Sequence, residues 1–246
     1  MSAGLRDFRG AVAGDLALLS VLHASELDAD RLAELQRLDF PDALAFRLQG
    51  DFGRDAMSLM REAMNELPDE PSAALLDELA ADFAAIYLTN GYGAYPAESV
   101  WIDEDGLTMQ EPMFQVRDWY QRYGLAVEDW RVRSDDHLVY QLDFLSHVLR
   151  DGGDEDLPEL ARFMDEHLLR WVLDFARRVA SRCATPLYAG LNSLTAAYVD
   201  ELRDVLAEVL GEARPTPEEI DERMRPKAEV QVAMPERYVP GVAPSW

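Results

Sequence analysis

Apolar residues recur every three or four positions along most of this 246-residue chain, and this spacing restricts its fold more than any other feature. The pattern runs from Leu5 to Leu210 and is interrupted by turns that contain glycine or proline. Such spacing places side chains on one face of an α-helix, whereas a half-buried strand alternates with a period of two. Residues 100–102 would be extended, but no other segment offers them a pairing partner, so we expect coil there. The pattern predicts an all-α, single-domain bundle of about nine helices. These include one that ends at Gly91 and Gly93, one near 112–124, one at 136–150, one long helix or two with a bend at 156–182, and a final helix that Thr185–Pro186 starts and that runs through Leu210.

The composition changes at the end of this helical region. Six prolines fall within residues 214–246, where the apolar spacing is lost. Proline removes a backbone donor and favours extended, linker-like chain. We therefore expect a helical domain at 1–213 and a proline-rich C-terminal tail at 214–246, with one short helix at 218–224.

The charge of the chain excludes some partners and favours others. There are 47 acidic and 23 basic residues, which gives a net charge of −24. Such a surface repels phosphates, so nucleic acid and anionic membranes are poor partners, and a basic peptide is a good one. Residues 62–116 hold twelve acidic side chains and no Lys, Arg or His. An equally open alternative is that the acidity only keeps the protein soluble or adapts it to a salty cell.

Cys183 is the lone cysteine, so neither an internal disulfide nor a cysteine metal cluster is expected. Its neighbours favour a buried thiol within a helix. The N-terminal residues lack the apolar core of a signal peptide, and no apolar run approaches the ~20 residues of a membrane span. We expect a cytoplasmic protein with no stable membrane insertion.

Two acidic–histidine pairs are the candidates for chemistry. Asp136 and His137 suit general acid–base catalysis or ligand binding. The sequence alone favours the alternative that Asp135 and Asp136 are first-turn acids of a helix from Asp136 to Arg150, with His137 packed and with Ser134 or Asp135 as the cap. Asp143 and His147 lie four residues apart, so both can reach one metal ion, yet a third ligand is missing. The chain has no phosphate-binding loop and no nucleophile elbow. We therefore predict no catalytic residue and no metal site.

The loop at residues 92–101 is unusually aromatic and lies inside the stretch without basic residues. Tyr92 and Tyr95 stand beside Pro96, and Trp101 follows. Aromatic residues at helical spacing usually belong to a core, but aromatic residues in a loop are those that a peptide-binding surface uses. The loop is therefore either ordinary core or part of a groove for a peptide.

Three sets of residues follow one another along the chain: Phe83, Ile86, Tyr87 and Gly91, then Pro96, Glu98, Ser99, Val100 and Trp101, then Asp135, Asp136, His137 and Leu138. In this order they resemble the TorD/DmsD family of molybdoenzyme maturation chaperones. The similarity covers about residues 10–210 and includes 167–171 and 186–188. Departures occur at 87–90, where a Leu-Phe-x-Gly step is usual, and at Asp135, where Pro or Glu is usual.

The resemblance implies an all-helical cytoplasmic chaperone that carries no cofactor itself. Its partners would be the twin-arginine leader and the apo catalytic subunit of a molybdopterin oxidoreductase, held until cofactor insertion. The chain would be a monomer or a domain-swapped dimer. The resemblance implies a leader-binding role for the residues at the matching positions, which are Phe83, Ile86, Tyr87, Pro96, Ser99, Trp101, Asp136 and His137. We add their neighbours Tyr95, Glu98 and Asp135 to this predicted peptide-binding set.

A leader with paired arginines and an apolar stretch needs both carboxylates and an aromatic groove. We hypothesise that Asp136 and nearby acids hold the arginines, while Tyr87, Tyr95 and Trp101 line the groove. Two alternatives stay open. One is an assembly factor for a molybdoenzyme that is never exported, of the nitrate reductase type. The other is a nucleotide-hydrolysing enzyme, since weak guanine-nucleotide binding has been attributed to some relatives.

Overall fold

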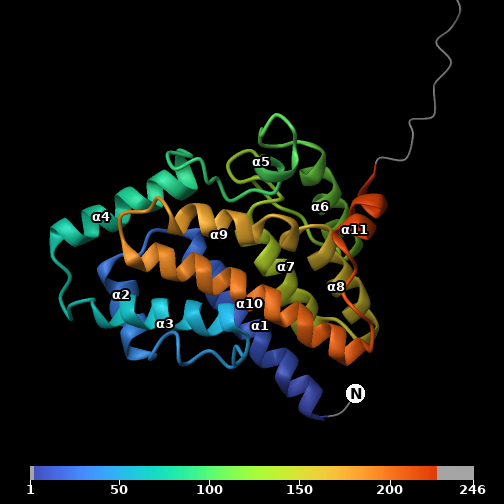
Figure 1. Ribbon diagram of the computed structural model, residues 1–246, viewed down its shortest axis with the longest axis horizontal. Coiled ribbons are helices and arrows are strands. Elements are labelled where there is room, and N and C mark those ends of the chain that lie inside the picture. The colour runs from blue at the N-terminus through green and yellow to red at the C-terminus, as the bar shows by residue number, and fades with distance from the viewer. Residues whose placement is uncertain (1–2, 226–246) are drawn as a thin grey trace, which may run out of the picture. The chain divides into compact units, whose positions relative to one another are not determined.

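The computed structural model describes residues 3–225, and within this range the chain forms helices and no strand (Figure 1). The predicted all-α class is confirmed. The chain divides into two units, Met1–Arg214 and Pro215–Trp246. The α-helices of the first unit are α1 (Ala3–Ala24), α2 (Ala29–Arg37), α3 (Asp51–Asn65), α4 (Ala73–Phe83), α5 (Ser99–Ile102), α6 (Glu111–Arg122), α7 (Leu138–Asp151), α8 (Leu157–Glu166), α9 (Val172–Ala180) and α10 (Pro186–Leu210).

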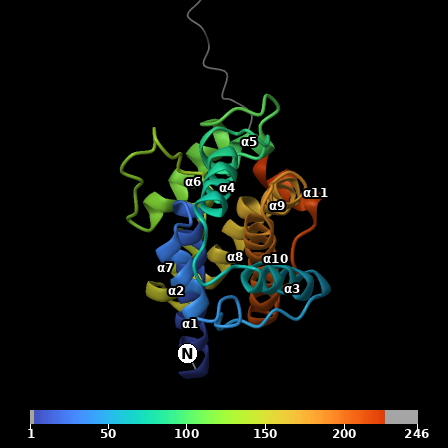
Figure 2. The same ribbon diagram turned by 90° about the vertical axis from the view of Figure 1, so that its left-hand side faces the viewer.

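The core of the first unit is built around α10, which runs through the bundle (Figures 1 and 2). This helix packs against α3 and α9, while α1 packs against α7. The large side chains of Tyr188 and Tyr198 on α10 and of Trp171 just before α9 are almost completely buried. A helix that is covered on most sides must be apolar on most sides, which accounts for the broad apolar character of residues 187–206.

The crossing of α3 and α10 depends on a glycine. A Cβ atom at Gly190 would lie 3.1 Å from both the Cα and the Sδ atoms of Met60. Glycine therefore lets the two helices approach more closely than any other residue would.

Two helix starts differ from the sequence prediction because of one side chain. Residues 99–102 form the short helix α5 and not coil, because the Asp136 carboxylate accepts a hydrogen bond from the Ser99 amide at the start of this turn. With Asp136 engaged there, α7 begins only at Leu138, and its N-cap is His137, whose Nδ1 accepts from the Val139 amide. The prediction that Ser134 or Asp135 caps this helix is wrong.

Other boundaries follow from backbone geometry. After α4 the chain continues as a π-helical turn, Ala84–Leu88, which ends before Gly91 and Gly93, the predicted stop. The left-handed residue that follows this turn is Asn90, whose φ is 54°. Residues 156–182, predicted as one long helix or two with a bend, form the two helices α8 and α9, with a 3₁₀ turn at Leu168–Arg170 between them. Cys183 lies after α9 outside any helix and is partly exposed, so the prediction of a buried helical thiol is wrong.

In the second unit, the described residues 215–225 contain the helix α11 (Pro217–Met224). The Thr216 side chain accepts from the Glu219 amide, and the Glu219 carboxylate accepts from the Thr216 amide, a reciprocal cap that stabilises a short helix. Four of the six tail prolines, from Pro226 onward, lie outside the described residues. Within residues 3–225, no helix is both long and apolar enough to cross a membrane.

Candidate peptide-binding site

Two of the three sequence segments that resemble the family meet at one junction, formed by residues 96–99 and 135–138. Ala97 and His137 form an isolated antiparallel bridge. On either side of it, the Glu98 amide donates to the Asp136 carbonyl at 3.1 Å, and the Leu138 amide donates to the Pro96 carbonyl at 2.9 Å. The structure therefore brings together segments that are almost forty residues apart in the sequence.

Asp136 is the centre of this junction and is completely buried. Its Oδ2 accepts hydrogen bonds from the Ser99 amide at 2.7 Å and from the Ser99 hydroxyl at 2.5 Å. The Ser99 Oγ in turn accepts from the Gln110 amide at 3.2 Å, just before α6. Asp136 Oδ1 is buried without a hydrogen-bond partner among the described residues. Asp136 thus ties the starts of α5, α6 and α7 to one another.

Glu98 is also completely buried and bridges two helices. Its Oε2 accepts from Gln141 Nε2 on α7 at 2.8 Å, and its Oε1 lies 3.0 Å from Nδ1 of His167 at the end of α8. A buried carboxylate without such partners would cost several kcal/mol. These contacts fix the position of the loop on the bundle.

Asp135 forms the third internal carboxylate contact. Its two oxygens accept from Arg117 Nε at 3.1 Å and Nη2 at 2.9 Å, a paired geometry that favours strong binding, and its side chain is only 3% exposed. Asp135, Asp136 and Glu98 are therefore all engaged by groups of the same chain.

The helical residues of the predicted site lie below the loop, in the core. Phe83, Ile86 and Tyr87 are buried, and the Tyr87 hydroxyl lies 2.6 Å from Nδ1 of His23. Burial lowers the pKa of His23 from 6.5 to about 3, and burial together with the Arg133 charge holds the pKa of His137 well below 6.5. Both imidazoles are consequently neutral at pH 7.

Tyr95 and Trp101 are the members of the predicted set that reach the surface, and both are partly exposed. The Trp101 indole Nε1 donates to the Tyr95 carbonyl at 2.9 Å, and the Tyr95 ring packs edge-on against His137 at 6.1 Å. Burial raises the pKa of Tyr95, which therefore stays protonated at pH 7. Pro96 beside them is buried.

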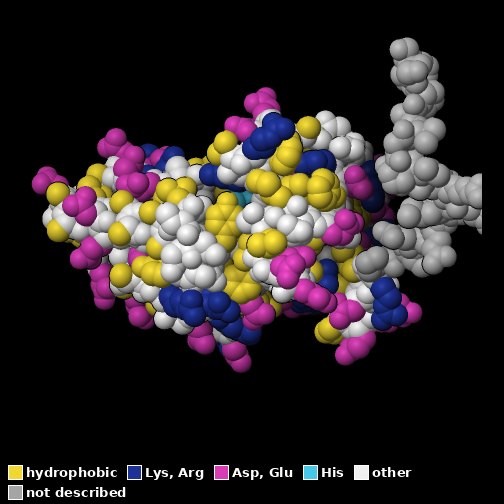
Figure 3. All heavy atoms as spheres, turned by 90° about the horizontal axis from the view of Figure 1, so that it is seen from above, with side chains coloured by type: hydrophobic (Ala, Val, Ile, Leu, Met, Phe, Trp, Pro, Cys, Tyr) yellow, Lys and Arg dark blue, Asp and Glu magenta, His cyan; other side chains and the backbone are white. Residues whose placement is uncertain are grey.

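Arginines from another part of the chain approach this loop, which the sequence alone did not indicate. The Arg178 guanidinium lies over the Trp101 ring at 5.3 Å and donates to the Gly93 carbonyl at 3.1 Å, and Arg182 donates to the Tyr92 carbonyl at 2.6 Å. Figure 3 looks onto this side and shows Lys and Arg side chains beside hydrophobic ones. Residues 62–116 contain no basic side chain, but in the folded structure Arg178 and Arg182 contact this stretch.

The histidine–acid pairs form no metal centre in the described part of the chain. No group of three or more His, Cys, Asp or Glu side chains is placed to hold a metal ion there. His147 Nδ1 lies 3.1 Å from Asp151 of the same helix.

Comparisons with known proteins agree with this architecture. Residues 53–177 match the family model described as nitrate reductase delta subunit. The chain is 31% identical over 206 residues to the chaperone protein TorD of Vibrio cholerae, which covers 80% of this chain and 91% of the relative. It is 30% identical over 189 residues to the chaperone protein TorD of Vibrio vulnificus, with 73% and 87% covered.

The all-helical fold and these similarities define the class of the protein, which is a maturation chaperone for molybdoenzymes. More narrowly, the chain belongs to the TorD/DmsD family of redox enzyme maturation chaperones.

Proposed function

We propose that this chaperone acts in the cytoplasm, without catalysis or a cofactor of its own, on the apo catalytic subunit of a molybdopterin oxidoreductase, and that it binds the twin-arginine leader of that subunit. The observation that carries the proposal is the arrangement at the junction. A partly exposed aromatic pair, Tyr95 and Trp101, is held by a buried hydrogen-bonded frame. Preorganised aromatic side chains bind a partner with little loss of conformational entropy.

Within this site, residues take one of two roles. Tyr95 and Trp101 contact the apolar residues of the leader. The others position that surface from below: Phe83, Ile86 and Tyr87 in the core, Pro96, Glu98 and Ser99 in the loop, and Asp135, Asp136 and His137 at the start of α7. This assignment revises the hypothesis that Asp136 holds an arginine of the leader, because its engaged oxygen already caps α5.

A second candidate follows from the family model, whose description names a nitrate reductase subunit and not an export chaperone. In this case the client carries no leader, and the chaperone assists the insertion of the molybdenum cofactor into an enzyme that stays in the cytoplasm. The two candidates differ in the ligand that the protein recognises. Binding of a synthetic twin-arginine leader peptide favours the first, and binding only to the leaderless apo subunit favours the second.

The test of the first candidate is the substitution Trp101→Ala, with titration calorimetry against a synthetic peptide that carries an Arg-Arg pair followed by apolar residues. An aromatic contact at the centre of an interface is worth about 2 kcal/mol or more, so we expect affinity to fall by about thirtyfold or more. Phe52→Ala on α3 is the matched control, since it removes an exposed ring elsewhere and should leave affinity unchanged. Equal affinity of Trp101→Ala and wild type would exclude Trp101 from the site.

A further inference from the structure

Two neighbouring cavities lie on the bundle surface at the end of α6. The first, of about 450 Å³, is lined by charged and polar side chains of α6, α7 and α8 that include Arg122, His147, Asp151 and Glu159. The second, of about 210 Å³, is mainly apolar and is lined by residues such as Leu125, Val127, Tyr140 and Phe144. Tyr120, which also lines the second cavity, donates a hydrogen bond to the Asp135 carbonyl of the junction at 3.0 Å. His147 lines both, so the two cavities adjoin at this side chain and together make up the groove at the end of α6. Its polar end is within the size range of ligand pockets.

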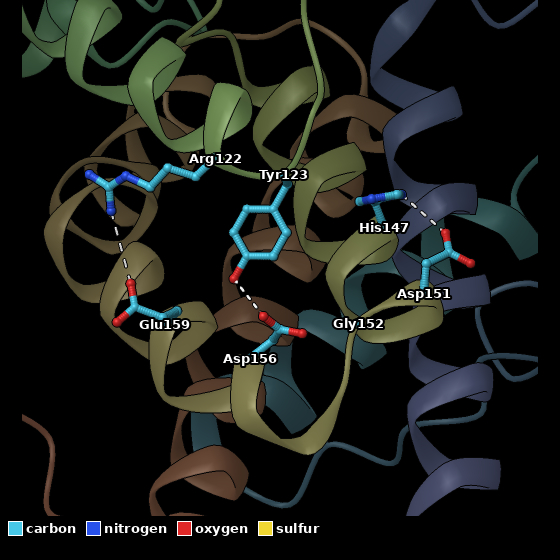
Figure 4. Close-up of a pocket in the computed structure, with 7 residues that line it drawn as sticks. All are labelled: Arg122, Tyr123, His147, Asp151, Gly152, Asp156 and Glu159. Carbon is cyan, nitrogen blue, oxygen red and sulfur yellow. Dashed lines mark hydrogen bonds and ion pairs between the residues drawn. The ribbon is translucent and has the colours of Figure 1, made fainter.

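At the polar end, the carboxylates of Asp151 and Glu159 lie on opposite sides of Tyr123 (Figure 4). Figure 4 shows the Tyr123 ring between the Arg122–Glu159 pair and the His147–Asp151 pair. The Tyr123 hydroxyl donates to Asp156 at 3.2 Å, which fixes the ring. The side chains of Asp151 and Glu159 remain 56% and 46% exposed. Two accessible carboxylates therefore flank one aromatic ring.

The existing partners of these carboxylates are weakly held. Arg122 Nη1 lies 4.0 Å from Glu159, and the Arg122 guanidinium is positioned over the Trp119 ring at 4.3 Å. Asp151 pairs with His147, which is a cation only when protonated. Exposed ion pairs of this kind contribute about 0–1 kcal/mol, so an incoming guanidinium displaces them at little cost. At the junction, by contrast, Asp135 is held by Arg117, and Asp136 and Glu98 are completely buried.

We infer that this groove binds the paired arginines of the client's leader at its polar end, one guanidinium near Asp151 and one near Glu159. The first apolar residues after the arginines occupy the second cavity, and the later ones contact Tyr95 and Trp101. The inference rests on the proposed function and specifies where the charged part of that ligand binds. Two arginines next to apolar residues match two carboxylates next to an apolar cavity in charge and in order. Arginine suits the site better than lysine because its planar guanidinium also stacks on an aromatic ring such as Tyr123.

The experiment compares the double variant Asp151→Asn plus Glu159→Gln with wild type by titration calorimetry. The probes are a synthetic Arg-Arg peptide with a following apolar stretch, and the same peptide with both arginines replaced by glutamine. We expect the double variant to bind the Arg-Arg peptide about tenfold or more weakly, since charge-assisted hydrogen bonds are the stronger ones. The glutamine peptide should bind both proteins with similar, low affinity. The matched control, Asp51→Asn plus Glu62→Gln on α3, makes the same charge change on exposed residues elsewhere and should bind as wild type does.

A second variant adds a positive charge to the groove instead of removing negative charges from it. His147→Lys places a permanent cation where the two cavities join, so it should also weaken binding of the Arg-Arg peptide, while circular dichroism shows an unchanged helix content. If both variants bind the peptide as tightly as wild type, the arginines bind elsewhere and the inference is wrong, although the leader-binding function stands. If wild type itself binds neither peptide, the proposed leader binding fails, and the inference fails with it.

Discussion

At the scale of single residues, the molecule separates charge that maintains the fold from charge that is accessible to a ligand. Asp136 and Glu98 are completely buried and receive hydrogen bonds from Ser99 and Gln141. Buried acids with internal partners serve to position backbone segments, and their removal leaves unsatisfied donors behind. Loss of leader binding in an Asp136 variant would therefore report a displaced loop as readily as a lost contact, and it must be read beside a stability measurement.

The buried histidines make the stability of the fold dependent on pH. The folded-state pKa of His23 is lowered to about 3, while the unfolded chain titrates near 6.5. Between these values the unfolded state binds the extra proton, so the free energy of unfolding falls as the pH drops below about 6.5. By linkage His23 alone accounts for a loss of about 2 kcal/mol between pH 7 and pH 5.

His23→Gln should lack this part of the pH dependence. Urea unfolding at several pH values is the measurement. The variant starts less stable at pH 7, because the contacts of His23 to Tyr87 and Thr195 change. The stability difference from wild type should then narrow toward pH 5 and stay constant above pH 7.5, where the histidine is neutral in both states. A difference that is the same at pH 5 and at pH 7 would contradict the assignment.

At the scale of elements, the sequence pattern predicted helices well, because helix formation depends on residues that are close together in the chain. The apolar spacing located the helices that became α6 to α10, and Thr185–Pro186 marked the start of α10. The start of α5 was missed, because the carboxylate that stabilises it comes from Asp136, remote in the sequence. For the same reason the approach of Arg178 to Trp101 had no signal near the loop.

The candidate site could be predicted only in part, because contacts between segments that are distant in the sequence leave no local signal. The pairing of residues 96–99 with 135–138 agrees with the motif order, and the structure brings these segments together. Burial depends on the whole fold, so the sequence left open whether Phe83 and Tyr87 face the core, and it did not indicate that Asp135 meets Arg117. The groove at the end of α6 was not anticipated either, because its walls come from three helices.

Two glycines on helices allow a matched test of element packing. Gly190→Ala places a methyl group against the backbone of Met60, so we expect a loss of about 1–3 kcal/mol in unfolding free energy. Gly14→Ala on α1 meets no atom within 4 Å, so it should instead gain about 0.5–1 kcal/mol through reduced backbone entropy. Chemical denaturation of both variants is the measurement. Equal effects of the two substitutions would mean that α3 and α10 do not approach closely at Gly190.

At the scale of the whole molecule, the net charge of −24 acts on folding and on binding in opposite directions. Like charges repel one another in the compact state, which lowers stability, whereas the same field attracts a basic ligand. Both effects weaken as the Debye length shrinks from about 30 Å at 0.01 M salt to about 10 Å at 0.1 M. Salt concentration is therefore a single variable that separates them.

We expect added sodium chloride to raise the urea midpoint of unfolding and, over the same range, to weaken binding of the Arg-Arg peptide several-fold. Urea is the suitable denaturant because it adds no charge. The glutamine-substituted peptide is the control for binding, since its weaker interaction should change little with salt. Buried pairs such as Arg203–Asp165, at 2.8 and 2.9 Å, are screened much less than exposed charges, so their contribution persists. If the urea midpoint instead fell with salt, attractive ion pairs would outweigh the repulsion of the acidic surface, and the acidity would not limit stability.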